Sequence, residues 1–228
     1  MYKFGLHRLI RSYKNRCMKP NNATRQQLLD CGLAMAKEAG LRALTVRGLC
    51  QRAGVNPGSF VYHFGSRDRY LAELLENWYA PLFRHMQSQL QQQASALPRL
   101  QTLLRQLLAF VAEHGELIAH MLLDAAAGET AAQGFLSTLA PRHPKLLLQS
   151  IADAQQAGEL ERGDPLHQAL FLMSALGLPA LAQHIIAGKP LLPGLIQQAF
   201  NTYAIDPRHI EQRLQWALRG LRPLEPQP

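Results

Sequence analysis

Apolar residues recur at helical spacing along most of this chain, and no alternating run interrupts them to predict a strand. The first such segment covers residues 24–39, where Asn22 or Thr24 is positioned as the helix cap and Gly40 as its end. The residues that follow are too few to take the chain far away, so we expect the next helices to pack against this one.

Residues 44–65 predict two short helices joined by a tight turn. Thr45 can cap the first of them, and Ala53-Gly54-Val55 breaks it. The apolar residues of this helix fall on one face at positions Val46, Leu49, Cys50 and Ala53. Asn56 and Pro57 then suit the first positions of the second helix, because Asn caps orphan N–H groups and Pro has none. This pattern is a helix-turn-helix.

The second of these short helices is predicted to present one face outward. Phe60 and Phe64 share a side and can pack inward. The remaining positions face out, with His63 at the edge; they are Pro57, Ser59, Val61 and Tyr62. An exposed second helix is the element that enters the major groove in helix-turn-helix proteins, so this face predicts contact with DNA.

The rest of the chain is also predicted to be helical. One helix begins after Ser66 and runs towards Gln91, with Pro81 as a kink or a break within it. Further helices are predicted over residues 100–114, 116–127, 130–139, 146–157, 165–187 and 195–203, and from residue 207 onward, each bounded by Gly or Pro. The fold class is therefore all-α, with a basic extension over residues 1–22, a three-helix head over 23–75, and a C-terminal helical domain over 76–228.

Charge divides the chain in the same place. Residues 1–75 hold 13 Lys and Arg against 4 Asp and Glu, whereas residues 76–228 hold 11 against 12. A basic surplus beside a helix-turn-helix favours double-stranded DNA as the partner, since phosphates attract it and counterions are released. Residues 1–22 could be a minor-groove arm, a membrane-surface segment or a poorly ordered extension; we favour the last, with Met18 as an alternative start to Met1.

Composition excludes several classes of protein. The three cysteines are widely spaced and include no Cys-x-x-Cys pair, which argues against a disulfide framework and against a zinc site. The N-terminus has no long apolar segment typical of a secretory signal, so a cytoplasmic location is expected. Residues 165–188 are uncharged, but their densest apolar part is about 14 residues long, which suits a buried helix better than a membrane span.

The head resembles the tetracycline-repressor (TetR) family of bacterial transcription regulators. The resemblance covers residues 24–75 and lies in Thr24-Arg25, Gly40, Leu44-Thr45-Val46-Arg47, Ala53-Gly54-Val55 and Tyr62-His63-Phe64-Gly65-Ser66-Arg67. It implies a homodimer that binds a palindromic operator and a variable C-terminal domain that binds a small-molecule effector. At Val61 this chain differs from many members, which have Tyr there.

The resemblance implies that Arg47, Ser59 and Tyr62 face the bases and that Thr45, His63 and Arg67 hold phosphates. Arg47 could make a bidentate contact to guanine, and Val61 could contact a thymine methyl group. Asn56 and Gly58 complete the candidate surface, since Gly58 lets the backbone approach DNA closely.

Two sets of residues in the C-terminal domain are candidates for other contacts. Bulky or polar groups predicted to surround a ligand cavity are Phe110, His114, His120, Met121, Asp124 and Phe171. Apolar positions predicted at a homodimer interface, formed by the helix over residues 165–187 and the last helix, are Leu170, Met173, Leu176, Leu214, Trp216 and Leu218.

The function expected is a ligand-responsive repressor with no catalytic step, no cofactor and no metal. One alternative is a constitutive DNA-binding protein without a ligand. Another is a helical metal enzyme with a DNA-binding head, because Glu116 and His120 share a helix face at i, i+4. The chain has no second pair at matching spacing and no nucleophile-elbow, P-loop or dinucleotide motif, which argues against the enzyme.

Overall fold

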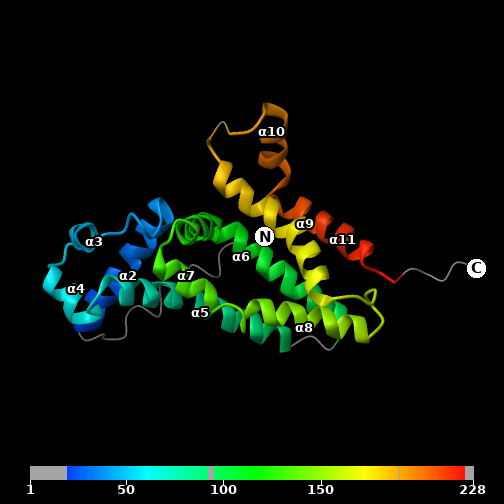
Figure 1. The fold of residues 1–228 in the computed structure, drawn as a ribbon, viewed down its shortest axis with the longest axis horizontal. Helices are drawn as coiled ribbons and strands as arrows, with labels where there is room; N and C mark the ends of the chain where they lie inside the picture. Colours follow the sequence, from blue (N-terminus) through cyan, green and yellow to red (C-terminus); the bar gives the residue numbers. More distant parts are fainter. Residues whose placement is uncertain (1–19, 92–94, 190, 224–228) are drawn as a thin grey trace, which may run out of the picture.

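A computed structural model describes residues 20–91, 95–189 and 191–223, and this part of the chain is helical without a strand (Figure 1). The helices are α2 (Pro20–Ala39), α3 (Val46–Ala53), α4 (Pro57–Phe64), α5 (Arg67–Gln91), α6 (Ala96–Ala126), α7 (Thr130–Ser137), α8 (His143–Gln156), α9 (Pro165–Ile186), α10 (Gly194–Tyr203) and α11 (Pro207–Gly220). The all-α prediction is confirmed. The first helix begins at Pro20, so Asn22 and Thr24 lie inside it and do not cap it.

Local capping chemistry fixes the helix-turn-helix as the sequence predicts. The Thr45 hydroxyl accepts a hydrogen bond from Gly48 N at 3.1 Å at the start of α3. Gly54 ends this helix with φ at +66°, a left-handed conformation that disfavours side chains. Phe60 and Phe64 of α4 are buried against the head core, with their ring centroids 5.5 Å apart. The opposite face of α4 is therefore left at the surface.

The core of the head continues into the C-terminal domain. One cluster of buried side chains joins Leu28 of α2 and Leu49 of α3 to Leu117 and Met121 of α6 and Phe135 of α7. Helix α5 runs through this cluster without a break at Pro81, which lies on its exposed side. At that position water can reach the backbone carbonyl that the missing N–H would have bonded. The predicted division after residue 75 does not coincide with a break in the core.

The long helix α6 differs from the prediction, which placed a helix end at His114-Gly115. Gly115 is buried within one continuous helix, and a Cβ added there would lie 1.9 Å from His184 Cδ2 of α9. This glycine therefore provides room for a neighbouring side chain rather than a turn. The prediction was wrong because a close approach between helices and a helix end both favour glycine.

Helix α9 packs on α6, α8 and α11, and α10 projects from the rest of the molecule beside it (Figure 1). By length and composition alone α9 could cross a membrane, and 39% of its most apolar window is buried in the protein. No residue of α10 is buried. Its C-terminal end is held by Arg213 of α11, which donates to Ala204 O at 2.7 Å and also to Tyr203 O.

Candidate functional site

The outward face of α4 is a candidate DNA-reading surface. Val61 and Tyr62 are 59% and 73% exposed, which is unusual for side chains of their size and apolar character. His63 is half-buried at the edge, where its ring lies 5.1 Å from the Tyr62 ring. Arg47 of α3 is exposed on the same head and forms no ion pair within the described residues.

Other predicted members of this surface form the cap of α4. The Asn56 Oδ1 atom accepts from Ser59 N at 2.9 Å and from Ser59 Oγ at 3.3 Å. A Cβ at Gly58 would lie 3.1 Å from the same oxygen, so the glycine makes room for the cap. Thr45, Asn56 and Gly58 are all exposed, and Ser59 is half-buried. Capping is thus the role that geometry assigns to Asn56, and DNA contact by these residues remains a prediction.

The surplus of basic over acidic residues is smaller in the described part of the head than in residues 1–75 as a whole. Six of the 13 Lys and Arg of residues 1–75 lie in residues 1–19, outside the described residues. The predicted extension over residues 1–22 also falls there, except for residues 20–22, which belong to α2. Residues 20–75 hold seven Lys and Arg against four Asp and Glu. Three of these basic side chains are already paired: Arg52 with Glu38, Arg25 with Glu73 and Arg67 with Glu129.

Arg67, predicted to contact a phosphate, bonds to residues of this chain. Its guanidinium donates to Leu44 O at 2.9 Å, to Leu41 O at 2.6 Å and to both carboxylate oxygens of Glu129 at 3.1 and 3.3 Å. The hydrogen bonds from Arg67 hold the pKa of Glu129 below its ordinary value. This pairing was not predicted because the partner carboxylate is distant in sequence. Arg67 joins the head to the N-terminus of α7, and its contact with a phosphate stays a prediction.

Asp124, predicted at the ligand cavity, also joins the head to the C-terminal domain. Its Oδ2 atom accepts from Leu41 N at 2.6 Å and from Arg42 N at 3.3 Å, in the turn between α2 and α3. Gly40 precedes this turn with φ at +82°, and a Cβ there would lie 2.7 Å from the same carboxylate oxygen. We call Arg67, Asp124 and Glu129, with the turn over residues 40–45, the head–body latch.

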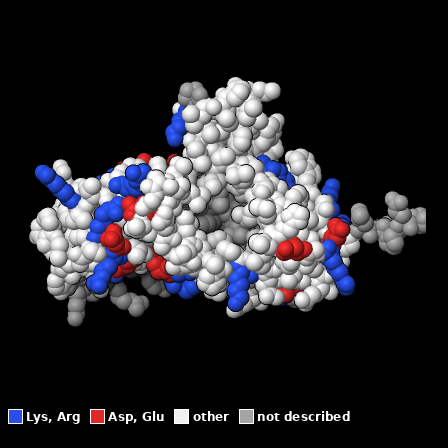
Figure 2. Space-filling model, in the orientation of Figure 1, with Lys and Arg blue, Asp and Glu red and all other residues white. Residues whose placement is uncertain are grey.

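A cavity of about 500 Å³ lies among α5, α6, α7, α8 and α9. It opens to the surface as the hollow at the centre of Figure 2, where the surrounding side chains carry no charge. None of the 18 lining residues is charged. They are Trp78, Tyr79, Leu107, Phe110, Val111, Ile118, Met121, Leu122, Phe135, Leu136, Leu139, His143, Leu170, Met173, Ser174, Gly177, Leu178 and Leu181.

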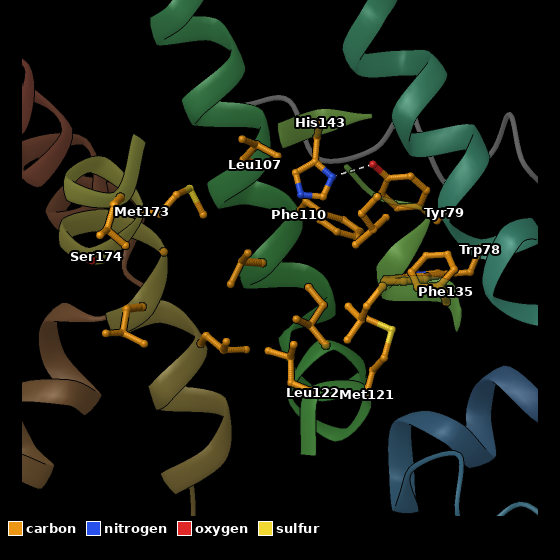
Figure 3. Close-up of a pocket in the computed structure, with 18 residues that line it drawn as sticks. Trp78, Tyr79, Leu107, Phe110, Met121, Leu122, Phe135, His143, Met173 and Ser174 are labelled. Carbon is orange, nitrogen blue, oxygen red and sulfur yellow. Dashed lines mark hydrogen bonds between the residues drawn. The ribbon is translucent and has the colours of Figure 1, made fainter. Parts of the chain in front are cut away.

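One polar pair lies in the cavity wall. The Tyr79 hydroxyl and His143 Nδ1 are 2.6 Å apart at the end of the cavity opposite Met121 and Leu122 (Figure 3). Burial, with a smaller effect from the Arg142 charge, lowers the pKa of His143 to about 4, and burial raises the pKa of Tyr79 to about 12. Both side chains are therefore uncharged at neutral pH.

The predicted ligand residues are only partly brought together by the fold. Phe110 and Met121 line the cavity. His114 packs behind it, 5.0 Å from the Phe110 ring and 5.7 Å from the Trp78 ring, and burial lowers its pKa. His120 is half-buried outside the cavity, and Phe171 is 43% exposed at the surface, because both lie on other faces of their helices.

Sequence reasoning missed Trp78, Tyr79 and His143. Trp78 and Tyr79 lie on α5, for which no cavity residue was predicted, and His143 falls between the helices predicted over residues 130–139 and 146–157. Proline at the second position of α8 in fact begins the helix there. That rule was available and could have placed His143 on α8.

The predicted dimer residues separate into two groups. Leu176, Leu214 and Leu218 are between 0 and 4% exposed within this chain's own core, so their assignment to an interface is wrong. Their stripe packs α9 and α11 against α6. Leu170, Met173 and Trp216 are 64%, 36% and 58% exposed. The first two also line the cavity.

The sequence of the helix-turn-helix head is similar to that of known regulatory proteins. Residues 28–74 match the sequence profile of bacterial regulatory proteins of the tetR family. The HTH-type transcriptional repressor KstR2 of Mycobacterium tuberculosis is 39% identical over 82 residues, which are 36% of this chain and 41% of that protein. KstR2 of Rhodococcus jostii is 39% identical over 59 residues, 26% of this chain and 29% of that protein. The matched part is thus well under half of either relative.

Solved structures share the overall fold. The transcriptional regulator FadR of Bacillus subtilis, in complex with stearoyl-CoA, has a TM-score of 0.66 at 14% identity and covers 86% of this chain and 99% of its own. The ketosteroid transcriptional regulator KstR2 of M. tuberculosis has a TM-score of 0.59 at 22% identity, covering 88% and 95%. Residues 28–74 therefore match the tetR family of bacterial regulatory proteins, and the described helices share the fold of these solved regulators.

Proposed function

We propose that this protein is a ligand-responsive transcriptional repressor. In this proposal a homodimer binds a palindromic operator on double-stranded DNA through two copies of α4, and a small-molecule effector in the α5–α9 cavity releases it. The observation that carries the proposal is that the exposed face of α4 and the walls of the cavity are connected by the head–body latch.

The α4 face has the chemistry of a reading helix. Arg47 can bond guanine in the major groove, Tyr62 can reach a phosphate or base edge, and Val61 can contact a thymine methyl group. His63 and Thr45 lie beside them as candidate phosphate contacts. The sequence profile of tetR-family regulatory proteins matches residues 28–74, which contain all of these side chains.

The latch supports a route from cavity to head. Met121 and Leu122 line the cavity on α6, and Asp124 follows them on the same helix and holds the turn before α3. Phe135 of α7 lines the cavity, and Glu129 at the start of that helix holds Arg67. A ligand that displaces α6 or α7 would move both carboxylates, and it favours release only if it binds the displaced form more tightly.

The dimer half of the proposal rests on an uncharged apolar surface. Exposed side chains on α9, α10 and α11 include Leu166, Leu170, Leu178, Leu195, Ile196 and Trp216. Between residues 165 and 205 the only Lys, Arg, Asp or Glu is Lys189, so two copies could meet through α9 and α10 with few opposing like charges. Light scattering of a Trp216→Asp variant tests this: a dimer that persists unchanged removes α11 from the interface.

An operator search tests the DNA half. The DNA flanking the protein's own gene is footprinted with the purified protein, and the protected site is used to compare Arg47→Ala with Arg208→Ala. Arg208 is the matched control because its side chain is 90% exposed on α11, away from the head. Arg47→Ala should weaken operator binding by about tenfold or more, since one good base contact contributes about 1–3 kcal/mol. Equal affinities would remove Arg47 from the reading surface.

The constitutive alternative makes a different prediction. A DNA-binding protein without an effector would protect DNA equally whether or not cell metabolites are added, and extracts therefore belong in the same footprint. Loss of protection on adding an extract supports the ligand half. Because its partner is DNA and no catalytic step is proposed, we place the protein in the cytoplasm.

A further inference from the structure

The cavity wall defines the chemistry of its occupant. All of its 18 lining residues are uncharged, and most are Leu, Ile, Val, Met, Phe or Trp. Placing an unpaired charge against such a wall costs several kcal/mol, so a group enclosed here must be neutral. Arg142, whose guanidinium lies 5.2 Å from the Tyr79 ring centroid, does not line the cavity and is bonded to Glu76 at 2.9 Å.

The Tyr79–His143 pair adds one hydrogen-bond donor in either tautomer. If the Tyr79 hydroxyl donates to His143 Nδ1, the imidazole carries its proton on Nε2. If Nδ1–H donates instead, the phenol retains its own O–H. The Tyr79 oxygen also accepts a hydrogen bond from the His143 backbone N–H, and this contact uses neither proton of the pair. One donor therefore remains for whatever occupies the cavity.

Trp78 contributes its indole ring to the same wall. Its indole Nε1–H is buried and has no hydrogen-bond partner in the part of the chain that the structure describes. Trp78 lies on α5 across the cavity from Met173 and Ser174 of α9 (Figure 3). Because this N–H is not accessible from the cavity, an occupant would contact the indole ring, and its polar contact would be with the Tyr79–His143 pair.

We propose that the cavity binds a neutral, largely apolar small molecule with a carbonyl or hydroxyl oxygen that accepts a hydrogen bond from the Tyr79–His143 pair. That this ligand regulates DNA binding rests on the proposed function, whereas binding of the ligand to the cavity can be measured without DNA. The proposed ligand differs from an anionic one such as an acyl-CoA, because the phosphates of an acyl-CoA require basic partners.

Trp78 is a reporter for the test, because the chain has only two tryptophans and the other, Trp216, is 58% exposed. In the full-length Trp216→Phe variant, Trp78 fluorescence is titrated with progesterone, methyl palmitate, palmitate and palmitoyl-CoA. The two neutral carbonyl compounds should change the emission, and methyl palmitate should bind at least tenfold more tightly than palmitate. Tighter binding of either anionic probe, or no binding of either neutral one, overturns the proposal.

A double variant tests the polar pair. Tyr79→Phe with His143→Phe replaces both partners by apolar groups of similar shape, which leaves no buried polar group unpaired and preserves folding better than either single change. Affinity for the neutral probes should fall about tenfold, the equivalent of one hydrogen bond. Tyr203→Phe, on exposed α10, is the control and should change nothing. Unchanged affinity in the double variant removes the pair from recognition.

Operator binding distinguishes this inference from the proposed function. Neutral probes that bind the cavity and leave operator affinity unchanged would support the ligand class and contradict the regulatory role. A sequence-specific footprint that persists when the neutral probes fail to bind would contradict the ligand class alone.

Discussion

The head–body latch predicts that Glu129→Gln will cost far more stability than an equivalent change at the surface. Glutamine keeps the length of the side chain, its capping oxygen for Ala131 N and one acceptor for Arg67, but removes the charge. The Glu129 side chain is 9% exposed and that of Arg67 is 28% exposed, so the pair is poorly screened by water.

The magnitude follows from that burial. Exposed ion pairs contribute about 0–1 kcal/mol, whereas removing one partner of a fully buried pair costs about 3–5 kcal/mol. Arg67 retains its bonds to two backbone carbonyls in the variant, so its charge remains partly stabilised. We therefore expect a loss of about 2 kcal/mol in the free energy of unfolding.

The assay is urea unfolding at pH 7, with Glu38→Gln as the control. Glu38 also pairs with an arginine through two hydrogen bonds, but its side chain and that of Arg52 are 58% and 43% exposed. The control should lose under about 1 kcal/mol. Equal losses in the two variants would refute the reasoning about burial.

The pH dependence gives a second measure of the same pair. Because the pKa of Glu129 is lower in the folded state, its stabilisation is present above the unfolded value of 4.5 and is lost as the pH falls through the folded pKa. The difference between wild type and Glu129→Gln should shrink below pH 4.5. A phosphate contact by Arg67 would instead appear in DNA binding, where Arg67→Met would lower the salt slope by about 1.

Three further predictions concern packing, protonation and DNA reading. Gly115→Ala should cost about 1–3 kcal/mol in thermal or urea unfolding, because the added methyl group meets His184, whereas Gly134→Ala meets nothing within 4 Å and should not destabilise. Between pH 7.5 and 5, wild type should lose about 2 kcal/mol more unfolding free energy than His143→Gln, as measured by urea unfolding. The reason is that the histidine pKa is about 4 in the folded state and 6.5 in the unfolded state, so only the unfolded state takes up a proton as the pH falls through 6.5. Val61→Tyr should change operator preference with an unchanged dimer mass, as measured by footprinting and light scattering; identical footprints and affinities would show that this position reads nothing.

Local chemistry made the head predictable from sequence. The caps at Thr45 and Asn56 and the left-handed Gly54 act within three or four residues, so the pattern alone places the ends of α3 and α4. The exposed side of α4 followed from the positions of Phe60 and Phe64 in the same way.

Long-range contacts could not be predicted in this way. Arg67 and Glu129 are 62 residues apart, and Leu41 and Asp124 are 83 apart, so no local pattern indicates that they meet. Exposed and buried apolar stripes also look alike in sequence. For this reason Leu214 was assigned to a dimer interface, whereas it is buried in the core of its own chain.

The continuous core also has a consequence for building chimeric regulators. A fusion that joins this head to another sensor after residue 75 would separate Leu28 and Leu49 from Leu117, Met121 and Phe135, and would leave apolar surface uncovered on both fragments. The transferable unit is the head together with the end of α6 and α7, as one folded piece. The head and the C-terminal domain of this chain are therefore exchangeable only where a donor protein supplies the same contacts.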